Sequence, residues 1–197
     1  GMVPPDNFIH IAEQTGQINA LTHWVFINSL KQYNAWCEVG LNISVAVNIS
    51  AENLKAPDFY DFICQSVEKY QVPAEKVTLE VTESADVDDP EAAIAILQKF
   101  KDRGMRISID DYGTGYSSLA QLKQLPVHEL KIDKSFVQRL CDDEDDRIIV
   151  RSTIELAHNM GLSVVAEGIE DEFALNWLAR NKCELGQGYF ISRPKPA

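Results

Sequence analysis

The stretch Lys76-Val-Thr-Leu-Glu-Val-Thr82 decides the fold, because the character of its side chains alternates along the chain. Its three aliphatic residues fall on one face of a strand, and Thr78, Glu80 and Thr82 fall on the other. A strand in an open parallel sheet is covered by helices on both faces and is apolar on both. A strand in a closed barrel turns aliphatic residues to the helices and its other face to the interior, so this stretch favours a barrel.

The rest of the chain repeats a strand–helix rhythm on either side of this stretch. Further strands are predicted at residues 42–48, 106–110, 129–133, 163–167 and 186–191. Helices are predicted at residues 20–37, 57–70, 90–104, from about 117, at 143–160 and at 171–180. Regular alternation of this kind implies parallel strands joined by crossovers, and hence an α/β fold.

The number of predicted strands is smaller than a complete barrel requires. A (β/α)8 barrel has eight strands and typically about 250 residues, whereas this chain has 197. We therefore expect one domain over residues 1–197, a TIM-like (β/α)8 barrel that is N-terminally truncated and lacks its first strand or strands.

Composition excludes several classes of protein. With 18 basic and 30 acidic side chains the formal net charge is −12, which argues against binding to polymeric nucleic acid. No apolar run is long enough to span a bilayer, so we expect no membrane segment. The four cysteines and four histidines show no zinc-type spacing, and reduced thiols in a cytoplasmic protein are expected.

Oxygen-bearing or cationic side chains stand at the end of each predicted strand. They are Asn48, Glu80, Asp110 with Asp111, Lys131, Glu167 and Gln187. In a barrel these ends meet at one rim. Carboxylate and amide oxygens are the ligands that Mg²⁺ and Mn²⁺ prefer. One Asp at a strand end is usually a turn or cap residue, but a whole series of such residues, one on each successive strand, predicts a cation site.

The same residues lie within a series of motifs that is specific in combination. The motifs are Val47-Asn-Ile-Ser50, Leu79-Glu-Val-Thr-Glu-Ser84, Asp110-Asp-Tyr-Gly-Thr-Gly-Tyr-Ser-Ser-Leu119, Leu130-Lys-Ile-Asp-Lys-Ser-Phe-Val137, Val165-Ala-Glu-Gly-Ile-Glu170 and Gln187-Gly-Tyr189. Through them the chain resembles the EAL-domain family, the phosphodiesterases that linearise the bacterial second messenger cyclic di-GMP. The resemblance covers essentially the whole chain.

The resemblance implies a role for each rim residue. Asn48, Glu80 and Asp110 would ligate a first metal ion, and Asp110 together with Asp111 would bind a second. Glu167 would be a ligand or the general base for the attacking water.

Other roles implied by the resemblance lie around these ligands. Lys131 would sit near the scissile phosphate, and Gln187 would support the shell of the first metal. Glu83 would anchor the glycine loop at residues 113–116 over the metals. Asp133 and Glu170 would support the ligands from outside.

The family's activity would then be metal-dependent hydrolysis of cyclic di-GMP to linear pGpG, with two Mg²⁺ or Mn²⁺ ions. A homodimer and fusion to further signalling domains are also implied. The family's Glu-Ala-Leu signature, which supplies another metal ligand, would precede residue 1, so the chain alone is expected to be inactive.

Three other interpretations were weighed. A non-catalytic cyclic di-GMP receptor or interaction module remains open. A glycosidase using Glu80 and Glu83 fits poorly, because alternation along a strand turns them to opposite sides. The acidic run at residues 142–146 could suggest calcium, but it better fits a helix N-terminus.

Overall fold

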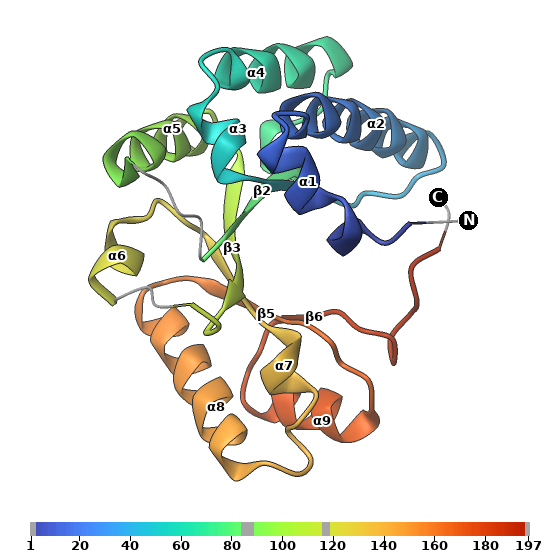
Figure 1. Ribbon diagram of the computed structural model, residues 1–197. Helices are drawn as coiled ribbons and strands as arrows, with labels where there is room; N and C mark the ends of the chain where they lie inside the picture. Colours follow the sequence, from blue (N-terminus) through green and yellow to red (C-terminus); the bar gives the residue numbers. More distant parts are fainter. Residues whose placement is uncertain (1–2, 84–88, 116–118, 196–197) are drawn as a thin grey trace. The chain divides into compact units, whose positions relative to one another are not determined.

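The computed structural model describes residues 3–83, 89–115 and 119–195 (Figure 1). The chain forms two compact units. Of the described residues, the first unit contains 3–81 and 89–106, and the second contains 82–83, 107–115 and 119–195. Each unit is built from helices and parallel strands.

The first unit contains the helices and strands between residues 5 and 102. Its elements are η1 (Pro5–Asn7), α1 (Ile9–Gln14), α2 (Ile18–Glu38), β1 (Val45–Ile49), α3 (Ala51–Lys55), α4 (Phe59–Tyr70), η2 (Ala74–Lys76), β2 (Val77–Thr82, less its last residue) and α5 (Pro90–Asp102). Strands β1 and β2 are parallel, with Asn48 opposite Glu80. Helices α2 and α4 pack side by side (Figure 1).

Aromatic and aliphatic side chains at helical spacing form the core of the first unit. Phe26 and Leu30 lie one turn apart on α2, and both are fully buried. Phe59 at the start of α4 meets Phe100 of α5 edge-on, with ring centroids 6.1 Å apart. The contact between Phe59 and Phe100 joins α4 to α5, and α2 packs against α4.

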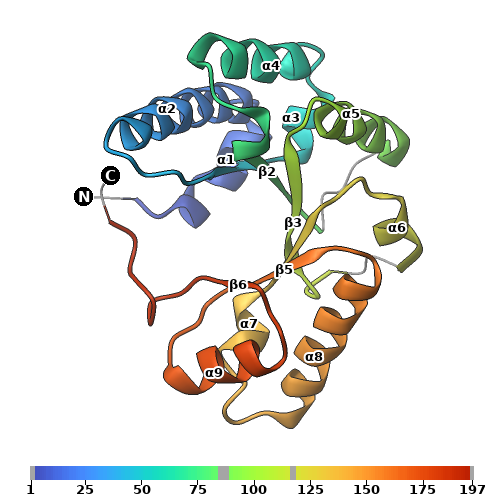
Figure 2. The same cartoon turned by 180° about the vertical axis from the view of Figure 1, so that it is seen from behind.

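The second unit contains the remaining strands. Its elements are β3 (Arg106–Tyr112, less its first residue), α6 (Leu119–Gln124), β4 (Glu129–Ile132), α7 (Lys134–Val137), α8 (Glu144–Asn159), β5 (Ser163–Ala166), α9 (Glu172–Arg180) and β6 (Leu185–Gly186). Strand β3 pairs with β4, β4 with β5 and β5 with β6, all in parallel. Helix α8 packs on α7, β4 and β5 (Figure 2).

The alternation seen in the sequence recurs in the burial of β1 but not in that of β2. In β1 the side chains of Val45, Val47 and Ile49 are buried, while those of Ala46 and Asn48 are exposed. In β2 both faces are buried up to Val81, so Glu80 is enclosed although it is polar. The predicted α/β fold is confirmed.

Several predicted boundaries are corrected. Strand β1 begins three residues later than expected and ends one residue later. The strand predicted at residues 186–191 is wrong: β6 ends at Gly186, and the chain then turns, with the Ile191 amide donating to the Gly188 carbonyl. Helices α3 and α7 were not anticipated, because both are too short to show helical periodicity. The expected helix start near residue 117 lies outside the described residues.

The acidic run begins helix α8, as predicted. Asp143 is the N-cap, and its Oδ1 accepts from the backbone amides of Asp145 and Asp146. Asp146 is buried and pairs with Arg139 at 2.8 Å. Among the described helices, none has the length and apolar character needed to cross a membrane.

We expect Asp143→Ala to lower the free energy of unfolding by about 1 kcal/mol, because two amides of the first turn lose their acceptor. Asp143→Asn should keep most of the stability, since the amide oxygen can still accept. Denaturant unfolding measures the change. Asp142→Ala, next to the cap and exposed, is the matched control, and an equal loss there would contradict the assignment.

Candidate metal and substrate site

Three acidic side chains converge in the second unit. Carboxylate oxygens of Asp110, Asp111 and Glu167 all lie within 4.8 Å of one another. The two aspartates are in the last part of β3, and Glu167 follows the last residue of β5. Parallel strands bring their carboxyl ends to one edge, so residues far apart in sequence meet there.

An irregularity in β3 allows two consecutive aspartates to share this site. Successive side chains on a regular strand point to opposite faces. The register between β3 and β4 shifts between Ile109 and Tyr112, and Asp111 has a φ of 54°, in the left-handed region. Aspartate tolerates this conformation better than most residues. The shift turns Asp111 toward the side of Asp110, as β-bulges near functional sites commonly do.

Lys131 supplies positive charge between the acidic side chains. It is buried in β4, with 5% of its surface exposed. Its Nζ lies 2.8 Å from Asp110 Oδ1 and 2.6 Å from Glu167 Oε1. A buried ammonium group requires such partners. Lys131 therefore ties the ends of β3 and β5 across the strand between them.

The acidic groups influence one another's ionisation. Burial raises the pKa of Asp111 to about 6, and the negative charges of Asp110, Asp133 and Glu167 add to the rise. Burial also acts to raise the pKa of Asp133, but hydrogen bonds from Ser135 outweigh it and hold that pKa below its usual value. Asp133 caps α7 through this same contact.

Glu83 contacts the glycine loop after β3. Its Oε2 accepts from the backbone amide of Gly113 at 2.7 Å and from that of Gly115 at 3.2 Å. Its own amide donates to the carbonyl of Asp110 at 3.0 Å. Glu83 is thus hydrogen-bonded to Asp110, before Asp111, and to Gly113 and Gly115, after it. Tyr116, the last residue of the predicted loop, lies outside the described residues.

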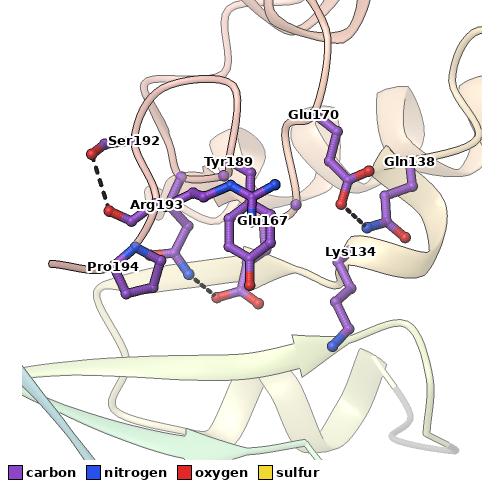
Figure 3. A pocket seen from close by; sticks show the side chains of 11 residues that line it. Lys134, Gln138, Glu167, Glu170, Tyr189, Ser192, Arg193 and Pro194 are labelled. Carbon is purple, nitrogen blue, oxygen red and sulfur yellow. Dashed lines mark hydrogen bonds between the residues drawn. The ribbon is translucent and has the colours of Figure 1, made fainter.

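A pocket of about 540 Å³ adjoins Glu167 (Figure 3). Its lining comprises Lys134, Gln138, Glu167, Gly168, Glu170, Gln187, Gly188, Tyr189, Ser192, Arg193 and Pro194. Figure 3 shows Arg193 and Pro194 to one side of Glu167, and Lys134, Gln138 and Glu170 to the other.

Two hydrogen bonds orient side chains in this pocket. Gln187 Nε2 donates to Glu167 Oε1 at 2.6 Å, and Gln138 Nε2 donates to Glu170 Oε1 at 2.8 Å. Glu170 therefore contacts Gln138, beyond the acidic cluster itself. Glu167, Glu170 and Gln187 were predicted from the sequence as site residues. Lys134 and Gln138 were not, although their spacing of four residues, at α7, would place them on one face of a helix.

The segment 187–190, of which residues 187–189 line the pocket, is held to Ile169 by backbone hydrogen bonds. The amide of Ile169 donates to the Gln187 carbonyl, and the amide of Phe190 donates to the Ile169 carbonyl, each at 3.0 Å. Between these bonds lies Gly188, where a Cβ would stand 2.2 Å from the backbone N and O of Ile169. Only glycine permits this approach.

Asn48 and Glu80, the other two predicted ligands, belong to the first unit. They are register partners on the parallel pair β1 and β2. Glu80 is 9% exposed, whereas Asn48 is on the exposed face of β1. Neighbouring positions in register place their side chains on one face of the strand pair.

The donor set of the cluster suits a hard divalent cation. Asp110, Asp111 and Glu167 offer oxygen ligands alone, as Mg²⁺ and Mn²⁺ prefer. Burial, and then the neighbouring carboxylates, raise the pKa of Asp111, and three carboxylates here face the single ammonium group of Lys131. A cation at this point would supply the balancing charge, so these residues fit a metal ion.

The sequence of the chain matches a known family. The family model for the EAL domain matches residues 1–194. The chain belongs to the EAL domain family. This confirms the resemblance seen in the motifs.

Two relatives show how EAL chains of this kind are named. The chain is 38% identical over 198 residues to the bifunctional diguanylate cyclase/cyclic di-GMP phosphodiesterase MucR of Pseudomonas aeruginosa, covering 100% of this chain and 29% of MucR. It is 34% identical over 197 residues to the cyclic di-GMP phosphodiesterase PdeR of Escherichia coli, covering 100% of this chain and 30% of PdeR. The chain thus spans less than a third of the length of these relatives.

A solved EAL structure has the same fold. The PaMucR phosphodiesterase in complex with c-di-GMP matches with a TM-score of 0.95 and 38% identity, over 100% of this chain and 80% of that one. The two units therefore correspond to parts of one EAL-domain fold.

We expect Lys131→Met to lower the free energy of unfolding by about 3 kcal/mol in the presence of a chelator, because Asp110 and Glu167 lose their buried counter-charge. Lys134→Met, at an exposed position in the same unit, should change it by at most about 0.5 kcal/mol. Denaturant titrations of both variants decide the matter, and equal effects would show that the Lys131 ion pairs contribute nothing.

Proposed function

We propose that the protein containing this chain hydrolyses cyclic di-GMP to linear pGpG with Mg²⁺ or Mn²⁺. The observation that carries the proposal is the buried Lys131 held between Asp110 and Glu167, beside Asp111. The names of MucR and PdeR supply the substrate class. Oxygen ligands for cations and a fixed ammonium group are what phosphodiester hydrolysis requires.

Each residue is assigned a distinct task. Asn48, Glu80, Asp110, Asp111 and Glu167 are proposed to hold two divalent cations, which would polarise the phosphoryl oxygens and lower the pKa of the attacking water. The assignment of the first two rests on their register pairing and on the family resemblance.

The remaining polar groups near Glu167 assist the reaction. Lys131 offers its ammonium to the negative charge that develops on the phosphate. Glu167, oriented by Gln187 and Lys131, accepts the proton of the water or serves as a further ligand. Glu83, Asp133 and Glu170 hold the surrounding loop and helix in place.

The pocket beside Glu167 is proposed to take one guanine base of the substrate. Arg193 stacks on the Tyr189 ring, with its guanidinium carbon 4.8 Å from the ring centroid. Together they offer a flat surface to a base. Gln138 and Glu170 supply a donor and acceptors on the other side. A guanine edge carries both donors and acceptors, which suits this pair.

Several broader features belong to the same proposal. We propose that the complete domain closes as a (β/α)8 barrel and that the protein acts in the bacterial cytoplasm. We also propose that it forms a homodimer and that its chain carries further signalling domains. The alternative is a receptor that binds cyclic di-GMP without cleaving it.

The full-length protein should convert cyclic di-GMP to pGpG with Mg²⁺ or Mn²⁺, and Ca²⁺ should inhibit, because its longer and looser coordination misplaces the water. Chromatography of the nucleotide products measures turnover. A protein that binds the dinucleotide yet forms no pGpG with either activating ion is a receptor, and the proposal is then wrong.

In the full-length protein Glu80→Ala and Asp110→Ala should abolish turnover, because each removes a ligand. Glu170→Ala should reduce turnover by about 10–100-fold without abolishing it, because Glu170 is not itself proposed as a metal ligand. Glu172→Ala, an exposed acid two residues further on, is the matched control and should keep wild-type turnover. Near-normal activity of Asp110→Ala would refute the metal assignment.

A further inference from the structure

Asn53, in the short helix α3, makes four hydrogen bonds through its side chain. Its side chain is 0% exposed. Its Oδ1 accepts from Ser50 N at 2.9 Å, from Ser50 Oγ at 3.0 Å and from Thr22 Oγ1 at 3.0 Å. Its Nδ2 donates to Asn19 Oδ1 at 2.7 Å. One amide thus joins the end of β1, the start of α3 and helix α2.

These contacts exceed what a helix cap needs. A capping box requires only that Ser50 and Asn53 bond each other's backbone amide, and both bonds are present. The bonds to Thr22 and Asn19 go further and attach the cap to α2. Helix α3 has five residues, too few to be stable by itself. Burying an amide with these four side-chain hydrogen bonds therefore fixes where the chain lies more than it strengthens α3.

The residue held in place is close to Asn48. Ser50 follows β1 directly, two residues after Asn48. Strand β1 pairs with β2 on one side, where Asn48 faces Glu80. The register of a strand decides which way every side chain points, and a slip of one residue turns all of them over. The bonds of Asn53 to Ser50 fix the end of β1 against such a slip.

We propose that Asn53 is a positioning residue for the metal site: by tying Ser50 to Thr22 and Asn19, it holds Asn48 in the orientation that presents its side-chain oxygen to a divalent cation. Asn53 acts through Asn48 and touches no ligand itself. The inference rests on the proposed function, in which Asn48 is a metal ligand.

The test is Mn²⁺ binding to the full-length protein without substrate, measured by electron paramagnetic resonance. Asn53→Leu keeps the volume of the side chain but removes its hydrogen bonds, and should weaken Mn²⁺ binding about 10-fold. Asn34→Leu is the matched control. Asn34 is on α2, the helix that Asn53 contacts, and its amide donates to the Tyr70 carbonyl at 2.8 Å, so this variant should keep wild-type Mn²⁺ affinity.

A double-mutant cycle separates positioning from general destabilisation. In an Asn48→Ala background, Asn53→Leu should cause no further loss of Mn²⁺ affinity, although it should still lower the melting temperature. The same loss of affinity with and without Asn48 would overturn the proposal, as would unchanged affinity in folded Asn53→Leu. If Asn53→Leu does not fold, Thr22→Val removes one donor, and the same cycle with it decides.

Asp110→Ala distinguishes failure of this inference from failure of the proposed function. If Asp110→Ala loses Mn²⁺ while Asn53→Leu keeps it, the metal site stands and the role of Asn53 is refuted. If Asp110→Ala binds Mn²⁺ like the wild type, both the proposed site and the inference are refuted.

Discussion

The pairing of Lys131 with Asp110 and Glu167 is the interaction on which the second unit depends. A lysine buried in the middle of three parallel strands is stable only with both carboxylates beside it. Those carboxylates in turn come from the strands on either side. The charges therefore set how the ends of β3, β4 and β5 align. The same alignment brings Asp111 beside the pair, so three carboxylates face a single ammonium group.

A second constraint acts on the backbone beside it. Asp111 adopts a left-handed conformation that most side chains avoid. The Gly113 and Gly115 amides bonded to Glu83 stabilise the loop that follows. The hydrogen bonds of Glu83 thus hold the strained backbone at Asp111 in place. Such strain is common at functional sites, and here it lets Asp110 and Asp111 lie on one side.

The sequence predicted an α/β fold with parallel strands, because strands with a period-two pattern, such as the one around Glu80, alternate with helices along the chain. Other features depend on contacts that no local pattern reveals. The turn after Gly186 replaces an expected strand because Gly188 lies against the backbone of Ile169. The turning of Asp111 toward Asp110 requires a positive φ, for which an aspartate gives only a weak signal. The anchoring of Asn53 is equally a tertiary effect.

The backbone hydrogen bonds around Gly188 hold this segment in place whatever side chains follow the glycine. Its two flanking hydrogen bonds involve only main-chain atoms, so they do not depend on which side chains follow. Tyr189, Ser192 and Arg193 are exposed on that attached segment. During evolution these three positions can therefore diversify at little expense to the fold, while Gly188 cannot. Natural variation among related chains should accumulate at these three positions, next to a glycine that does not change.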